Sequence, residues 1–195
     1  LSAPFNGDKT ILFKTKMRYS NTVWGNDGLA LVYEGLRSRQ QSGINRFNPI
    51  TGDLERIFTR NTTDAYSNPG SAVTKPNEFG QSVLWTIDKG NKVLFNNTTG
   101  SSPKGDLPFL LSFHVHTKKV DTLWKCSEGV FETVQKIIDA ENGVLITQRE
   151  SEKEVPNYFQ KDLIRRIGDR PLTNFKNPYP AMDGVTKEKI FYKRA

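Results

Sequence analysis

Asp53-Leu54-Glu55-Arg56-Ile57-Phe58 decides the fold, because its pattern of polar and apolar residues returns twice further along the chain. The second copy is Lys119-Val120-Asp121-Thr122-Leu123-Trp124, and the third is Arg170–Phe175, in which Asn174 interrupts the pattern. Each copy follows a strand-like run and a polar turn, and the closing aromatic residues are 66 and 51 residues apart. This spacing predicts a repeated β-structure.

The rest of the chain also reads as β-strands. Short runs of β-branched and aromatic residues alternate with turns rich in Gly, Asn, Asp and Pro, such as Asn26-Asp27-Gly28 and Glu141-Asn142-Gly143. The apolar positions of Phe131–Ile138 also suit one face of a helix, so this run has two interpretations. The predicted strands are Thr10–Thr15, Thr22–Gly25, Leu29–Glu34, Ser82–Ile87, Lys92–Asn96, Pro108–Thr117, Phe131–Ile138, Val144–Arg149 and Asn157–Ile164.

Two strand-like runs precede each copy of the hairpin, which makes about four strands in every 50 to 60 residues, the size of a β-propeller blade. We therefore predict an all-β fold, a partial β-propeller of about three four-stranded antiparallel blades. Closing a ring takes about four to eight blades. The predicted divisions are the end of a preceding blade (1–20), a first blade (21–60), an inter-blade loop (61–79), a second blade (80–126), a third blade (127–178) and a linker (179–195).

Composition excludes several classes of protein. No apolar run is long enough for a membrane-spanning helix, and no secretory leader opens the chain. The one cysteine, Cys126, rules out an internal disulfide framework and a cysteine-based zinc cluster, so a structural role is expected for it. The net charge is +7, but the basic residues are scattered and the aromatic residues lie at apolar strand positions. A nucleic-acid site would need a contiguous basic patch, so no nucleic-acid partner and no membrane partner are predicted.

Catalytic motifs are missing. The chain has no Gly-x-Ser-x-Gly nucleophile elbow and no phosphate-binding loop. The two histidines, His114 and His116, would point to the same face of a strand. They could form a metal pair that lacks a third ligand, but no convergent carboxylate can be named, and a solvent-facing strand edge is the favoured interpretation. No catalytic residue, no metal ligand and no cofactor is therefore assigned.

Three carboxylates alternate along Glu150-Ser151-Glu152-Lys153-Glu154. If the strand continued through this run, they would share one face and could perform acid–base chemistry or bind a substrate amine. Lys153 between them and Pro156 just after them favour a solvated loop instead.

Several stretches together resemble one family. They are Leu1–Phe5, Arg18 with Trp24-Gly25, Leu29–Glu34, Asp64–Gly70, Gly100–Leu110, Pro156–Leu163, and Leu172-Thr173 with Pro178. The chain resembles the β-propeller portion of prolyl-oligopeptidase-family serine peptidases, and within them the glutamyl-endopeptidase-like branch. The resemblance also makes Thr186–Tyr192, followed by Lys193-Arg194-Ala195, look like the strand that leads into an α/β-hydrolase domain.

The resemblance implies a non-catalytic propeller that caps the active site of a serine oligopeptidase and gates access of substrates. The family's Ser, Asp and His triad lies downstream of the residues present here. Its partners would be the C-terminal α/β-hydrolase domain of the parent chain and a peptide substrate, with self-association through open blade faces. A parent that cleaves after Glu needs cationic groups for the carboxylate, and Arg18, Arg37 and Arg39 are the substrate-facing candidates. The parent is expected to be bacterial and periplasmic or secreted. The alternative is a stand-alone β-sheet module that binds a protein or a glycan.

Overall fold

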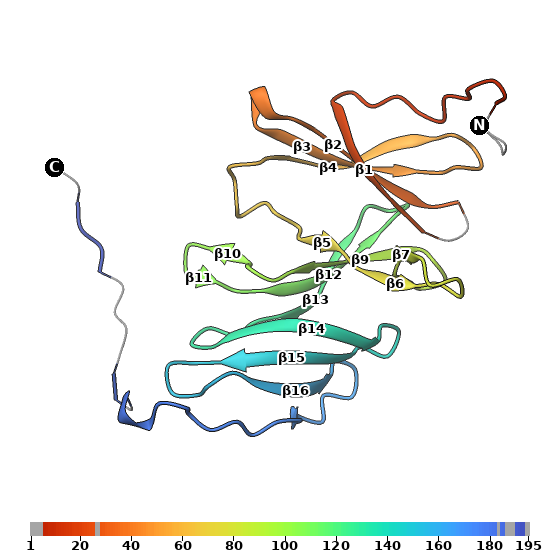
Figure 1. Ribbon diagram of the computed structural model, residues 1–195. Coiled ribbons are helices and arrows are strands. Elements are labelled where there is room, and N and C mark those ends of the chain that lie inside the picture. Colours follow the sequence, from red (N-terminus) through yellow and green to blue (C-terminus); the bar gives the residue numbers. More distant parts are fainter. Residues whose placement is uncertain (1–5, 26–27, 183, 186–189, 194–195) are drawn as a thin grey trace.

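The computed structural model describes residues 6–25, 28–182, 184–185 and 190–193, and its regular structure is almost entirely antiparallel β-sheet. Three sheets stack face to face along the molecule (Figure 1). The first contains β1 (Arg18–Trp24), β2 (Ala30–Leu36), β3 (Gln41–Phe47) and β4 (Leu54–Asn61). The second contains β5 (Ser71–Ala72), β8 (Thr86–Ile87), β9 (Lys92–Asn97), β12 (Phe109–His114) and β13 (Val120–Lys125). The third contains β14 (Phe131–Asp139), β15 (Val144–Glu150), β16 (Asn157–Asp162) and β17 (Arg170–Pro171).

Strands follow one another in chain order across the first and third sheets, β1-β2-β3-β4 and β14-β15-β16-β17. Two small hairpins, β6 (Thr74–Pro76) with β7 (Ser82–Leu84) and β10 (Ser101–Ser102) with β11 (Gly105–Asp106), stand outside these sheets. The helical turns η1 (Arg37–Arg39) and η2 (Pro180–Met182) are too short to span a membrane, and no described helix is long and apolar enough to do so.

Apolar side chains fill the two spaces between the sheets. Leu31 and Ile44 of the first sheet pack against Phe95 and Phe113 of the second, and the ring of Phe58 lies 5.0 Å from that of Phe113. Burial in this layer raises the pKa of Tyr33 to about 12, because the phenolate would lose its hydration. The second layer joins the other two sheets through Leu94, Leu110, Trp124, Val134, Ile137 and Leu145.

The all-β prediction is confirmed, and Phe131–Ile138 lies within strand β14, so its helical interpretation is wrong. The middle sheet corrects the expected four strands. Two short strands, β5 and β8, take the place of the single strand expected beside β9, and each pairs with a different part of it. The residues between them leave the sheet, and Ser82–Leu84 pairs with Thr74–Pro76 instead of with β9. An Asn77–Gly80 turn closes that hairpin, which explains why the predicted Ser82–Ile87 strand is divided.

Thr10–Thr15 is also not a strand. This segment lies over the outer face of the first sheet, where the Phe13 ring packs 4.8 Å from that of Phe47. Phe13 packs on the sheet, but Ile11 and Leu12 are exposed and the backbone pairs with no described strand, so this run of β-branched and aromatic residues does not form a strand. The predicted C-terminal strand Thr186–Tyr192 falls largely outside the described residues, as do Leu1–Phe5 and the Asn26-Asp27 part of a turn; described residues 190–193 form no strand.

Candidate functional site

The predicted substrate-facing arginines lie at one end of the stack. Arg18 begins β1 and pairs with Gly35, while Arg37 and Arg39 lie in η1, which joins β2 to β3. The η1 turn of the first sheet, the β10–β11 hairpin of the second and the loop 151–156 of the third all lie at the left in Figure 1. We call this the η1 end. The strand pairing agrees with this placement, because the three connections join equivalent strand pairs: β2 to β3, β9 to β12 and β15 to β16.

Arg18, Arg37 and Arg39 are exposed, and no described residue forms an ion pair with any of them. The turn that carries two of them is closed by Gln40, which adopts a left-handed conformation with φ 51° and donates its backbone N–H to the Arg37 carbonyl. The three guanidinium groups therefore reach solvent at the η1 end and remain available to an anionic ligand.

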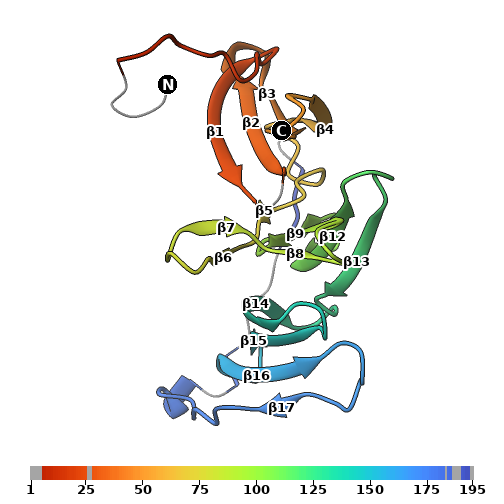
Figure 2. The same ribbon diagram turned by 90° about the vertical axis from the view of Figure 1, so that its right-hand side faces the viewer.

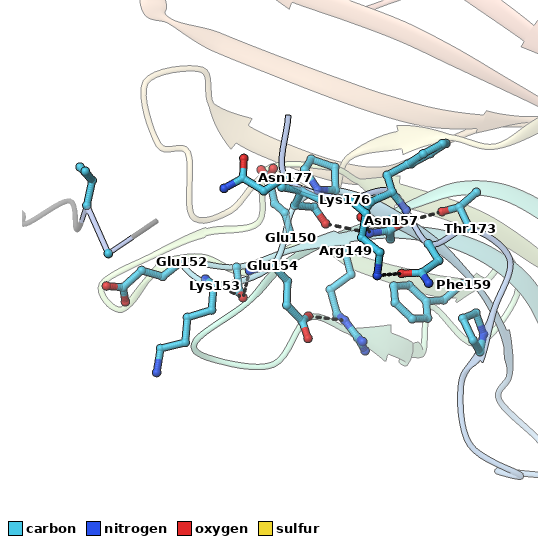
Figure 3. Close-up of a pocket in the computed structure, with 18 residues that line it drawn as sticks. Arg149, Glu150, Glu152, Lys153, Glu154, Asn157, Phe159, Thr173, Lys176 and Asn177 are labelled. Atoms are coloured by element: carbon cyan, nitrogen blue, oxygen red, sulfur yellow. Dashed lines mark hydrogen bonds and ion pairs between the residues drawn. The ribbon is translucent and has the colours of Figure 1, made fainter. Parts of the chain in front are cut away.

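The third sheet carries a cavity of about 980 Å³ at the same end (Figure 3). Its walls are the loop 151–156, the end of β15 with Arg149 and Glu150, and the segment 173–177 that follows β17. Strand β15 includes Glu150 and ends there, so the loop interpretation is confirmed for Ser151–Glu154. Both carboxylate and ammonium groups line this open cavity, so it can accept polar groups of either sign.

An ion-pair chain connects the cavity wall to the sheet interior. Glu132 is buried and accepts a hydrogen bond from the Thr147 hydroxyl at 2.6 Å, and its carboxylate lies 3.2 Å from Lys161 Nζ. Lys161 also reaches Asp169 at 2.6 Å, and Asp169 pairs with Arg149 at 3.3 Å. The Arg149 guanidinium stacks 4.0 Å above the Phe159 ring, which fixes this side chain at the cavity wall.

Asn157 holds the opposite wall. Its Oδ1 accepts hydrogen bonds from the Thr173 hydroxyl at 2.8 Å and from the Phe175 backbone N–H at 2.7 Å, and its Nδ2 donates to the Phe175 carbonyl at 3.2 Å. The third copy of the sequence repeat therefore differs from prediction, because regular pairing stops after Pro171 and the Asn157 side chain replaces the missing ladder bonds. Phe175 is consequently exposed, unlike the closing aromatic residues Phe58 and Trp124.

The first sheet contains a second buried carboxylate, which the sequence did not reveal. Glu34 of β2 accepts hydrogen bonds from Asn45 Nδ2 of β3 at 3.1 Å and from the Met17 backbone N–H at 2.6 Å. It also forms an ion pair with Arg56 of β4, whose Nε donates to Asn45 Oδ1 at 2.8 Å. A Cβ at Gly43 would overlap the Arg56 guanidinium, so any other residue there would force that side chain to shift. No local sequence signal distinguishes Glu34 from a surface residue at a strand end.

The histidine pair is not on one strand face. His114 ends β12, whereas His116 lies in the following turn, and His114 Nδ1 accepts hydrogen bonds from the backbone N–H groups of His116 and Thr117, both at 3.3 Å. The imidazole therefore caps the turn. No group of three metal-ligating residues occurs within the described part of the chain.

Cys126 is buried beside the start of β14, and the Glu132 backbone N–H lies 3.2 Å from its sulfur. Burial raises the thiol pKa, because the thiolate would lose its hydration. These contacts agree with a structural role.

No model of a known protein family matches the chain. The chain is similar to two plant proteins named as peptidases. It is 32% identical to "Probable glutamyl endopeptidase, chloroplastic" of Arabidopsis thaliana and 30% identical to the protein of the same name from Oryza sativa subsp. japonica, over 98% of its own length in both cases. It spans only about a fifth of each relative, 21% and 22%.

Among solved structures, TolB from Acinetobacter baumannii matches 84% of this chain and 34% of its own, with 14% identity and a TM-score of 0.42. A likeness this distant carries no conclusion about function or fold.

Proposed function

We propose that the chain is a non-catalytic β-propeller section of a longer serine peptidase similar to the glutamyl endopeptidases, which we call the parent enzyme. The observation that carries this proposal is the similarity to two proteins of that name over 98% of the chain. Stacked antiparallel sheets whose strands follow chain order support it, because this is how propeller blades are built. The three sheets would form three blades, and the second blade would then begin at β5, within the segment 61–79 that was predicted as an inter-blade loop.

In this proposal the η1 end faces the catalytic domain and gates the access of peptides to it. The segment 173–182, whose first residues line the cavity, leads from β17 towards this end (Figure 1), which supports this orientation. Arg18, Arg37 and Arg39 would then face the substrate, and their unpaired guanidinium groups suit a glutamate side chain. Outer sheet faces that the segment with Phe13 does not cover would also allow the isolated chain to self-associate.

Peptide hydrolysis by the parent enzyme tests the proposal. We expect the parent enzyme to cleave a glutamate peptide in a reaction blocked by a serine-directed reagent, whereas the 195-residue chain alone should show no turnover. Turnover by the isolated chain, or none by the parent enzyme, would refute the proposal.

The substrate-facing role is tested by removing each of the three arginines in the parent enzyme. Loss of one productive ion pair should reduce the preference for Glu over Gln about tenfold, which corresponds to roughly 1.4 kcal/mol. Lys104→Ala is the control, because Lys104 lies in the second sheet's hairpin at the same end and is paired with Glu128. Unchanged preference in all three arginine variants would exclude this role.

A further inference from the structure

A fourth exposed cation lies beside the three arginines of the η1 end, in the segment that enters β1. Lys16 lies two residues before Arg18, and its side chain is exposed. Figure 2 shows this segment reaching the top of the first sheet, where β1 begins. Arg18 pairs with Gly35 across the antiparallel strands β1 and β2. Lys16 and Arg37, which lie two residues beyond this pair, are therefore at the same end of the first sheet.

The buried Glu34 network holds this segment in place. The Met17 backbone N–H donates to Glu34 Oε2 at 2.6 Å, and Glu34 is itself buried and paired with Arg56. Met17 lies between Lys16 and Arg18, so its fixed backbone sets the point from which both side chains extend. The Glu34 carboxylate therefore positions two cations while its own charge is balanced by Arg56.

Four exposed cations thus form one group at this end, which we call the cation group: Lys16, Arg18, Arg37 and Arg39. None of its members has an ion-pair partner within the described chain. The carboxylates of Glu34 and Asp64 are engaged elsewhere, Glu34 by Arg56 and Asp64 by two backbone N–H groups of its own loop. A cluster of like charges without counter-charges attracts an anionic ligand, so the cation group favours an acidic peptide.

A single glutamate side chain does not use the whole cation group. A carboxylate has two oxygens, and one guanidinium can engage both of them. Lys16 lies on a different segment from Arg37 and Arg39, so it reaches a different part of a bound peptide. We propose that the parent enzyme favours peptides with a second acidic residue close to the glutamate at which it cleaves, and that Lys16 contacts this second carboxylate; this inference rests on the proposed function.

The test uses the parent enzyme and fluorogenic peptides that carry one glutamate at the cleaved bond and Glu, Gln or Lys at successive positions on either side of it. At low salt, Glu at the favoured position should lower KM about twofold to fivefold relative to Gln and leave kcat nearly unchanged, because one exposed ion pair is gained away from the cleaved bond. Lys16→Ala should abolish this difference, and Lys16→Glu should reverse it, so that Lys is preferred to Glu. Lys89→Ala is the control, since Lys89 is an exposed cation in the turn between β8 and β9, at the opposite end of the stack.

Equal KM values for the Glu and Gln peptides at every position would overturn this inference and leave the proposed function standing, because cleavage after a single glutamate would be unaffected. An equal loss of the difference in Lys16→Ala and Lys89→Ala would also overturn it, because the effect would then belong to the net charge and not to the cation group. Failure of the wild-type parent enzyme to cleave any of the peptides would refute the proposed function and this inference together.

Discussion

The first and third sheets each bury one carboxylate, but they stabilise it differently. Glu34 faces away from the stack, and its partners come from β3, from β4 and from the Met17 backbone in the covering segment. Glu132 accepts a hydrogen bond from Thr147 and pairs with Lys161, and the chain of charges continues through Asp169 to Arg149 at the cavity. The Glu34 network is enclosed within the first sheet and its covering segment, whereas the Glu132 network of the third sheet extends to the candidate site.

This difference indicates two roles for buried charge. A buried ion pair contributes little net stability compared with apolar residues, but removal of one partner leaves a charge without compensation. Around Glu34 the network fixes the segment over the outer face of the first sheet. Around Glu132 it fixes Arg149 and hence the shape of the cavity wall. Substitutions that break each network should therefore have different consequences.

Arg56→Ala should have the largest effect. It leaves Glu34 buried with only the neutral donors Asn45 and Met17, and we expect a loss of about 3–5 kcal/mol in the free energy of unfolding. Urea denaturation of the 195-residue chain measures this loss. Arg60→Ala on the same strand is the control and should cost less than about 1 kcal/mol, because Arg60 makes one exposed bond to the Asp64 carbonyl. Equal losses in the two variants would show that the Glu34 network does not stabilise the sheet.

Lys161→Met should cost about 2–4 kcal/mol, because Glu132 loses its cationic partner but keeps its Thr147 donor. This is less than Arg56→Ala, because methionine keeps the apolar volume of the lysine stem whereas alanine removes that of arginine. Lys136→Met, at an exposed position of β14, is the control and should be nearly neutral. If Lys161→Met is neutral as well, Glu132 is not held by this ion pair and the contrast between the two networks fails.

The sequence predicted most strands because half-buried strands need alternating apolar residues and their turns need residues that tolerate unusual backbone angles. Gly143 at φ 65° and Gly90 at φ 91° lie in such turns. The interruption of the middle sheet could not be predicted, because Ser82–Leu84 has the same pattern whether it pairs with β9 or β6. Glu34 and Glu132 were missed for a related reason, since a strand pattern shows which face a residue lies on but not what covers that face.

The candidate site was only partly accessible from sequence. The loop at Glu150–Glu154 followed from Lys153 and Pro156, and the arginines followed from the resemblance. The wall built by Asn157 depends on contacts 16 and 18 residues away, which no local pattern specifies.

Asn157→Ala tests that wall. Loss of its bonds to Thr173 and Phe175 should cost about 1–2 kcal/mol and speed backbone hydrogen exchange at Phe175, because the segment after β17 would lose its attachment. Hydrogen exchange followed by mass spectrometry measures both the site and the extent of opening. Asn174→Ala is the matched control in the same segment, since Asn174 is exposed and is bonded to Lys176. Unchanged exchange in Asn157→Ala would mean that the cavity wall is held by other contacts.

Lys118→Ala should have the smallest effect on the free energy of unfolding. It compares an ion pair at the surface with the two buried networks. Lys118 bonds to Glu55 at 2.6 Å and links the second sheet to the first, and this hydrogen bond lowers the carboxyl pKa. A carboxyl whose folded pKa is lowered contributes stability above its unfolded pKa of about 4.3, and the contribution is lost as the pH falls through the folded pKa. At pH 7 and low salt we expect Lys118→Ala to cost about 0.2–1 kcal/mol in the free energy of unfolding. This difference should vanish at acidic pH and in 1 M salt, where the Debye length is about 3 Å.

Lys89→Ala is the control. Lys89 lies in the neighbouring turn at the same end of the second sheet and has no described ion-pair partner, so its substitution should show neither dependence. Arg56→Ala should keep most of its cost in salt, because water and ions do not reach Glu34; a salt-insensitive Lys118→Ala or a strongly salt-sensitive Arg56→Ala would contradict the distinction between exposed and buried charge.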